Sequence, residues 1–315
     1  MLIRQSIHAG IDIGGTKCAG ILLDEQGRTI LFHEVPMRST WKPSEIRSLL
    51  QSLITDLAER AHIPMKRIKT LGIGVPGLVD IHGKLLKAAN LPRLERVQLT
   101  TLFPRMRITV YNDASCAIYA ESLMGELAHS ERGVLLMLGT GLGSAVMTRD
   151  AFEGNEAVTI QNMELGHICA RIQAASAPDL DDEPYELGAY CSRRFFKRIS
   201  KKSIERLAKE AGEGSEDARQ IFQEFGIHLG SALATVETIQ RPDRIVLGGG
   251  LMQYQSLFEQ TMLGTFHARR FLPTKPALVL ASAFGPEVGA IGAALYGMTG
   301  FVKRGSLSRT NVNTL

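Results

Sequence analysis

Two glycine-rich turns in the sequence carry the residue types that bind phosphate groups. One lies in "GIDIGGTKCAG" and the other in "LLMLGTGLGSAVM", and each joins two apolar runs. In such a turn, successive backbone N–H groups point outward without a Cβ in front of them and form a concave anion site. For either turn alone, a tight hairpin turn without a ligand is the alternative. The residues are Gly14, Gly15, Thr16 and Lys17 in the first turn and Gly139, Thr140 and Gly141 in the second.

A third glycine-rich turn, in "DRIVLGGG", follows a run that is typical of a buried strand. Three such turns favour the binding of a polyphosphate, and a third turn without side chains would let an adenine group approach the backbone. The hairpins form no G-x-G-x-x-G motif, and the chain has no G-x-x-x-x-G-K-[ST] motif, so a nucleotide would be bound in another way. Asp12, just before the first turn, could hold Mg²⁺ through water, because this ion prefers carboxylates and phosphate oxygens. The third turn consists of Gly248, Gly249 and Gly250.

Asp113, in "YNDASCA", stands where a predicted strand passes into a predicted helix. Two interpretations stay open. Aspartate is a favoured helix N-cap. A carboxylate at this position could also be the general base that accepts a proton from an attacking hydroxyl group. In phosphoryl transfer the nucleophile needs only positioning and such an acceptor, and Asn112 could orient the same hydroxyl.

Glu164 and His167, in "MELGHICA", lie three residues apart around a glycine, so their side chains are expected to converge. The alternative is an ordinary surface pair. His167 together with Cys169 and Cys191 raises the question of zinc, but a structural zinc site needs four ligands at compact spacing. We therefore expect no zinc site.

The elements that must position these residues follow from the spacing of apolar side chains. The pattern predicts strands alternating with helices, hence an α/β fold with mixed sheets that are flanked by helices. We expect a helix that begins at Ser44 as N-cap and a final helix rich in glycine and alanine, "EVGAIGAALYGM". The other expected elements are hairpins over residues 8–24 and 133–148, strands over 68–77, 107–113 and 243–250, and helices over 114–127 and within 203–241.

Each hairpin opens one half of the chain, which predicts two related domains. We expect a small N-terminal α/β domain of residues 1–112 plus about 297–315, and a large C-terminal α/β domain of residues 113–296. The end of the chain would thus return to the first domain.

Composition excludes several classes of protein. The chain has 315 residues, of which 44% are hydrophobic and 22% charged, and a net charge of +4. Its basic residues are scattered, so we expect no nucleic-acid partner. No segment approaches the roughly 20 apolar residues of a membrane span, and no signal peptide is recognisable, so we expect no membrane partner. Four widely spaced cysteines without a C-x-x-C motif predict free thiols and a cytoplasmic protein.

Taken together and in this order, these segments resemble the ROK family, the repressors and sugar kinases of the actin-like ATPase superfamily. The similar segments are "DIGGTK", "GVPGLVD", "AANL", "YNDASCAIYAE", "LGTGLGSAV", "ELGH" and "IVLGGGL". The resemblance implies two actin-like (ribonuclease H-like) domains with a cleft between them. It also implies an ATP- and Mg²⁺-dependent kinase that phosphorylates a hexose, with glucose to glucose 6-phosphate as the first expectation.

The resemblance also implies roles for single residues. Asp113 falls on the family's general base, and its substrate-binding residues fall on Gly77, Asn90, Asn112, Glu164, His167 and Glu186, the last in "YELGAYCS". The chain departs from the family in "RIQAASAPDLDDEPYE", where the zinc-binding cysteine loop is missing, and at Ser115, where the family has asparagine. We therefore expect His167 to serve the sugar alone.

Two alternatives to an ATP-dependent glucokinase stay open. Relatives without zinc include glucokinases that use polyphosphate, so the phosphoryl donor is undecided. A non-catalytic, sugar-sensing regulator is the other alternative; only nine residues precede Gly10, so we expect no DNA-binding domain. A homodimer is expected.

Overall fold

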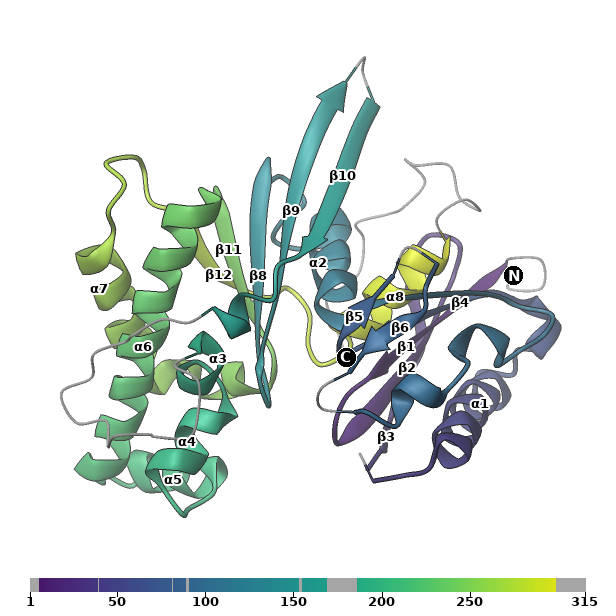
Figure 1. Ribbon diagram of the computed structural model, residues 1–315, viewed down its shortest axis with the longest axis horizontal. Coiled ribbons are helices and arrows are strands. Elements are labelled where there is room, and N and C mark those ends of the chain that lie inside the picture. Colours follow the sequence, from purple (N-terminus) through teal and green to yellow (C-terminus); the bar gives the residue numbers. More distant parts are fainter. Residues whose placement is uncertain are drawn as a thin grey trace. The chain divides into compact units, whose positions relative to one another are not determined.

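The structure is a computed structural model in which residues 6–38, 40–80, 82–88, 91–152, 155–168 and 186–298 are described. The chain forms two compact units (Figure 1). The first unit comprises the residues up to His129 and those from Ala283 onward, and the second comprises Ser130–Ser282.

The first unit is built on a five-stranded sheet in the order β3-β2-β1-β4-β7. The strands β1, β2 and β3 are antiparallel neighbours, whereas β1, β4 and β7 run parallel. Its strands are β1 (Ile7–Ile13), β2 (Lys17–Leu23), β3 (Thr29–Pro36), β4 (Ile68–Val75) and β7 (Arg107–Asn112), with a separate pair β5 (Leu78–Val79) and β6 (Leu85–Lys87). Its helices are α1 (Pro43–Arg60), α2 (Asp113–Met124) and α8 (Val288–Met298).

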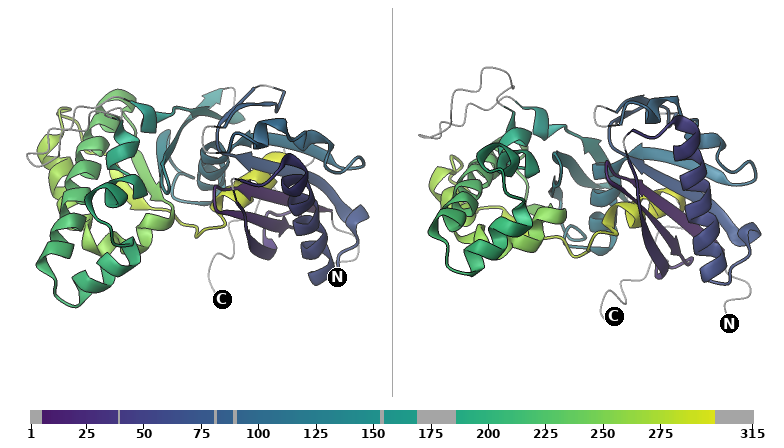
Figure 2. Two further views of the ribbon diagram at one scale, coloured as in Figure 1. Left: turned by 60° about the horizontal axis from the view of Figure 1, so that its bottom comes forward. Right: turned by 90° about the horizontal axis from the view of Figure 1, so that it is seen from below.

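Helices α1 and α8 cover opposite faces of this sheet (Figure 2). Gly20 of β2 faces Leu53 and Leu57 of α1, whereas Gly10 of β1 faces Ala290 of α8. Gly10 and Gly20 lie on neighbouring strands one register position apart, and successive residues of a strand point to opposite faces. Helix α1 begins one residue before the predicted cap, because the Glu45 carboxylate accepts the backbone N–H of Lys42 at 2.6 Å.

Glycines bring α8 into backbone contact with the rest of the first unit. A Cβ at Gly72 of β4 would lie 1.6 Å from the carbonyl oxygen of Ala293, and one at Gly292 would lie 1.7 Å from that of Cys116 in α2. The ring of Tyr296 is stacked between Tyr111 and Tyr119, with centroid distances of 4.0 Å on both sides. The absence of a side chain at these glycines is thus what lets the helix sit on the sheet.

These contacts place the unit boundary elsewhere than predicted. The expected boundaries, 112/113 and 296/297, both lie inside the first unit, which ends at His129 and resumes at Ala283. The reason is that α2 packs against α8, and both belong to the first sheet's helical cover. The predicted return of the final helix to the first half is confirmed, and it involves the whole of α8.

The second unit repeats the sheet topology of the first. Its strand order is β10-β9-β8-β11-β12, again with three antiparallel neighbours followed by parallel ones. The prediction of mixed sheets flanked by helices is confirmed. The strands are β8 (Arg132–Leu138), β9 (Leu142–Phe152), β10 (Asn155–Asn162), β11 (Arg244–Gly248) and β12 (Leu278–Ala281), and the helices are α3 (Leu187–Tyr190), α4 (Arg193–Ile199), α5 (Ile204–Gly212), α6 (Glu216–Gln240) and α7 (Glu259–Arg269).

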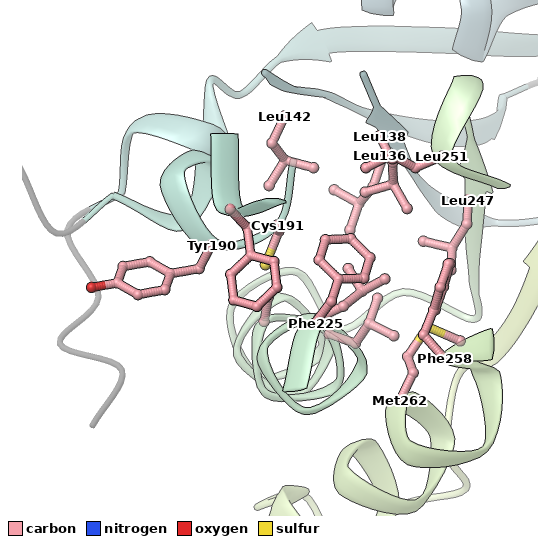
Figure 3. Close-up of a cluster of buried hydrophobic side chains, with 14 of the residues drawn as sticks. Leu136, Leu138, Leu142, Tyr190, Cys191, Phe225, Leu247, Leu251, Phe258 and Met262 are labelled. Atoms are coloured by element: carbon pink, nitrogen blue, oxygen red, sulfur yellow. The ribbon is translucent and has the colours of Figure 1, made fainter. Parts of the chain in front are cut away.

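The core of the second unit lies between its sheet and helix α6. Alternate residues of β8, among them Leu136 and Leu138, share one buried cluster with Phe225 of α6 and with Phe258 and Met262 (Figure 3). The rings of Phe225 and Phe258 meet edge to face at a centroid distance of 5.1 Å. This packing fixes the carboxyl ends of β8 and β11, where two of the glycine-rich turns begin. Among the described residues no helix is long and apolar enough to span a membrane.

His228 of α6 makes the stability of the second unit depend on pH. Its side chain is buried beside Tyr190 and Phe195, and burial lowers its pKa from 6.5 to about 4. Below pH 6.5 this histidine binds a proton in the unfolded chain. In the folded chain it stays neutral down to about pH 4. The free energy of unfolding should therefore fall with falling pH in this range, by at most about 1.4 kcal/mol per pH unit from this group. The free energies of unfolding in urea at pH 7 and pH 5 should differ less in His228→Gln than in the parent.

Candidate functional site

Parallel strands gather the predicted residues of the first unit at one edge of its sheet. Asp12 pairs in register with Gly74, and Asn112 pairs with Val75, so β1, β4 and β7 end side by side. A Cβ at Gly74 would lie 3.4 Å from Oδ1 of Asp12 and 3.6 Å from Cα of Asp113. Both acidic residues therefore border the same small space in front of a glycine.

Asn112 takes the capping role that competed with the catalytic interpretation of Asp113. Its Oδ1 accepts the backbone N–H of Ser115 at 3.0 Å, so Asn112 is the N-cap of α2. Its Nδ2 donates to the carbonyl oxygen of Gly77 at 3.1 Å. Asp113 lies one residue further on, in the first turn, where its Oδ1 accepts the N–H of Ala114 at 2.8 Å. The alternative that Asp113 is the N-cap is thus wrong.

Gly77 is needed by the backbone of this edge. Its φ angle is +139°, and a Cβ there would lie 2.0 Å from the carbonyl oxygen of Lys87. The carbonyl oxygen of Gly77 accepts the hydrogen bond from Nδ2 of Asn112. Asn90, the remaining predicted sugar residue of this half, lies outside the described residues.

The first glycine turn joins β1 to β2 and is closed by a bond from the N–H of Gly14 to the carbonyl of Lys17 at 2.9 Å. A Cβ at Gly15 would meet no atom of the described chain within 4 Å, and its φ is not in the left-handed region. The fold itself therefore does not require glycine at position 15. Thr16 is exposed, and the exposed Lys17 ammonium pairs with Glu34 of β3.

Asp12, which the sequence proposes as a ligand of Mg²⁺, lies near the end of β1. Burial raises the pKa of its carboxyl group to about 6, against the opposing effect of Lys17. Its carboxylate lies against α8, since a Cβ at Gly289 would be 2.5 Å from Oδ2. A partly desolvated carboxylate is a hard oxygen donor of the kind that Mg²⁺ prefers, so this residue fits the ion expected from the sequence.

The second unit places its two glycine turns next to each other. Strands β8 and β11 are parallel neighbours, and a Cβ at Gly249, where φ is +91°, would lie 2.6 Å from the carbonyl oxygen of Leu138. Gly249 is therefore required by the fold. Gly141 is different, because a Cβ there would meet no described atom within 4 Å, and one at Gly139 would meet only the carbonyl of Gly141, at 3.9 Å. Thr140 between them is exposed.

Gly248 and Gly250 complete the third turn. Gly248 packs on Met137, whose Sδ would lie 2.8 Å from an added Cβ. Gly250 is open in the same way as Gly141, since Nη2 of Arg193 is the single described atom within 4 Å of an added Cβ, at 3.9 Å. Open glycines at the carboxyl ends of two adjacent strands leave their backbone N–H groups accessible to an anion.

Glu164, His167 and Glu186 converge in the second unit, as the sequence predicts for the first two. His167 Nε2 lies 3.8 Å from Oε2 of Glu164, and Nδ1 lies 3.3 Å from Oε1 of Glu186. Arg194 reaches the other oxygen of Glu186 at 3.6 Å. Glu164 and His167 are 48% and 61% exposed, so both can reach a ligand, whereas Glu186 is 16% exposed.

The backbone at Glu164 is held in an unusual conformation. Its φ and ψ angles are 46° and 38°, in the left-handed region that non-glycine residues seldom adopt. Asn162 Nδ2 donates to Oε1 of Glu164 at 2.9 Å, and the next N–H, of Leu165, donates to the Ser144 hydroxyl at 2.8 Å. Such conformations gather at binding sites, where surrounding contacts hold them. Sequence reasoning missed Asn162 and Ser144, although an amide two residues before Glu164 is a usable signal.

Among the described residues no group of three or more His, Cys, Asp or Glu side chains could hold a metal ion. Cys191 is buried, and burial raises the pKa of its thiol to about 12. Cys169 and the segment in place of the cysteine loop lie outside the described residues, so the expectation of no zinc stays a prediction.

Comparison with known proteins decides the family. The sequence model of the ROK family matches residues 8–298. The chain belongs to the ROK family. An N-acetyl-D-glucosamine kinase of Vibrio parahaemolyticus is 27% identical over 274 residues, which are 81% of this chain and 87% of that protein.

Solved structures of this ROK protein's relatives share its fold. A ROK family glucokinase from Streptomyces griseus, solved with glucose and AMPPNP, matches with a TM-score of 0.73 at 20% identity, covering 94% of this chain and 100% of that one. An inorganic polyphosphate/ATP-glucomannokinase from Arthrobacter matches with a TM-score of 0.65 at 23% identity, covering 94% and 99%. The actin-like fold is thus confirmed. The relatives also confirm the predicted class of activity, a phosphotransferase with an alcohol group of a sugar as acceptor.

Proposed function

We propose that this ROK protein transfers the γ-phosphoryl group of ATP to a hydroxyl group of a glucose-type sugar. In this proposal Asp113 is the general base, and Glu164, His167 and Glu186 bind the sugar. The observation that carries the proposal is the capping of α2 by Asn112, because the side chain of Asn112, and not that of Asp113, accepts the N–H of Ser115. Asp113 then accepts the proton of the sugar hydroxyl as that oxygen attacks phosphorus.

The other residues bind and orient the two substrates. The carboxylates of Glu164 and Glu186 accept hydrogen bonds from sugar hydroxyl groups, and His167 between them fixes their spacing. The N–H groups at Gly15, Gly141 and Gly250 bind phosphate oxygens of the donor, whereas the N–H of Gly139 closes its own turn by donating to the carbonyl of Gly141 at 3.0 Å. Asp12 would hold Mg²⁺, which, when bound, neutralises charge on the phosphate oxygens.

The names of the relatives support a particular choice of acceptor sugar in this proposal. The sequence favoured glucose, whereas the curated relatives are N-acetyl-D-glucosamine kinases at 26–27% identity. We therefore place N-acetyl-D-glucosamine first and glucose second. Polyphosphate remains the alternative donor, because a ROK-like structure is that of a polyphosphate/ATP-glucomannokinase.

A release assay for ADP over a panel of sugars tests this function. The purified protein, with ATP and Mg²⁺, should release ADP with N-acetyl-D-glucosamine or glucose and not without sugar. Parallel reactions with polyphosphate should give less sugar phosphate than those with ATP. No turnover with any hexose and either donor, together with sugar binding by calorimetry, would instead favour a sugar-sensing regulator.

Gly141 offers a direct test of phosphate binding. Gly141→Ala adds a Cβ that meets no described atom, so the free energy of unfolding should not change. The Cβ would stand in front of the N–H groups of the turn, and loss of one hydrogen bond to a charged phosphate should raise the KM for the donor about tenfold or more. The KM for the sugar should stay the same. Gly264→Ala, at an equally open glycine in α7, is the control and should leave both KM values unchanged.

A further inference from the structure

Arg193 joins the two glycine turns of the second unit. Its backbone N–H donates to the carbonyl oxygen of Gly139 at 3.0 Å. Its guanidinium lies at the other turn, with Nη2 beside the open position of Gly250. No sequence motif singled out this residue, because it follows Ser192 at the start of α4, far from both turns along the chain.

The conformation of Arg193 is fixed from two sides. Ser192, which is fully buried, donates its hydroxyl to the carbonyl of Gly188 at 2.6 Å and accepts the N–H of Arg194 at 3.2 Å. Oε1 of Glu205 in α5 accepts a hydrogen bond from Nη1 of Arg193 at 3.3 Å. A guanidinium has five N–H donors, so this single ion pair leaves Nη2 able to donate toward the turn.

We infer that Arg193 is a ligand of the phosphoryl donor and binds its phosphate chain near the nucleoside end. This inference rests on the proposed function and names a residue that the sequence did not. The side chain is 32% exposed and lies where the Gly139–Gly141 turn and the Gly248–Gly250 turn meet. A planar cation with donors in a fixed fork suits phosphate oxygens.

The alternative explanation is an ordinary surface ion pair between α4 and α5. Such a pair contributes little to stability and would not affect a substrate. Arg206 provides the matched control, since it lies in α5 directly after Glu205, is 68% exposed and pairs with Glu210 at 3.0 Å. The two arginines differ in that only the first borders the glycine turns.

The test is steady-state kinetics of Arg193→Met, Arg193→Lys and Arg206→Met. Arg193→Met should raise the KM for ATP about 10- to 100-fold, as expected for a lost charge-assisted hydrogen bond. The KM for the sugar and the midpoint of urea unfolding should change little, and Arg193→Lys should recover part of the affinity for ATP. Arg206→Met should behave like the parent protein.

Competition experiments identify the part of the donor that Arg193 touches. The inhibition constant of inorganic tripolyphosphate against ATP should rise in Arg193→Met, while that of adenosine should not. An unchanged KM for ATP in an active protein overturns the inference but leaves the proposed kinase intact. An equal rise in the inhibition constant of adenosine also overturns the inference, because Arg193 would then contact the nucleoside. A parent protein that phosphorylates no sugar rejects the proposed function itself, and calorimetry of ATP binding to the parent and to Arg193→Met then decides the inference by the same comparison.

Discussion

Asp113→Asn should lower kcat by about 10²- to 10⁴-fold, the size of effect that loss of a general base produces. The amide keeps the shape of the side chain but cannot accept the proton of the attacking hydroxyl. The fold should persist, because Asn112 retains its bonds to Ser115 and Gly77. Sugar binding, measured by calorimetry, should weaken by much less than turnover does.

Asp217→Asn is the matched control for this experiment. Asp217 is an exposed aspartate in the first turn of α6, and it favours its helix in the same way that Asp113 favours α2. Loss of such a charge costs about 0.3–1 kcal/mol of stability. Both variants should therefore lose similar stability, and only Asp113→Asn should lose turnover. Equal kcat values in the two variants would contradict the role of Asp113 as base.

The largest expected loss of stability follows from one added methyl group at Gly292. Gly292→Ala places a Cβ 1.7 Å from the carbonyl oxygen of Cys116 in α2, so α8 must move away from α2. Overpacking of this kind costs about 1–3 kcal/mol, and a rigid backbone neighbour favours the upper end. Trp41, the only tryptophan of the sequence, packs on the core of the first unit. Its fluorescence during urea unfolding should report a lower midpoint.

The same substitution in another helix should raise the free energy of unfolding. Gly264 lies inside α7, and a Cβ there meets no described atom within 4 Å. Alanine is favoured over glycine in a helix by about 1 kcal/mol, so Gly264→Ala should be stabilising in unfolding followed by circular dichroism. If Gly292→Ala is as stable as the parent protein, the backbone contact between α8 and α2 does not exist in solution.

Local patterns account for the parts of the fold that the sequence predicted. Both hairpins and helix α1 depend on residues close together in the chain, such as an apolar run that enters a glycine turn. Helix α7 was not expected, because only Met262 and Phe266 are buried in it and Gly264 interrupts its pattern. What holds α7 is a distant contact, since Gly226 and Gly230 of α6 leave room for it.

Strand β10 was missed for a related reason. It is an edge strand without a buried residue among those whose burial is described, and its apolar side consists of only Val158 and Ile160. Pairing with β9 over eight residues defines it instead. The unit boundary was misplaced because the packing of α2 against α8 joins residues more than 150 positions apart.

The residues of the candidate site also fall into two groups, those that local patterns in the sequence revealed and those that they did not. The glycine turns, Asp12 and the pair Glu164–His167 were recognisable from residue types at short spacing. Glu186 is 19 positions beyond His167, so its place beside that imidazole depended on the resemblance to a family rather than on a local pattern. The left-handed backbone at Glu164 and the capping of α2 by Asn112 rather than Asp113 depend on hydrogen bonds that no composition reveals.

The return of α8 to the first unit has a consequence for how the protein is made. The second unit is one continuous stretch, Ser130–Ser282, and is complete on the ribosome while the first still lacks its last helix. Until then the faces of Gly10 and Gly72 lie uncovered, although the residues around them were translated first. The half that begins the chain is therefore the last to finish folding, and a premature stop between Ala283 and Val288 leaves the second unit complete but removes α8 from the first.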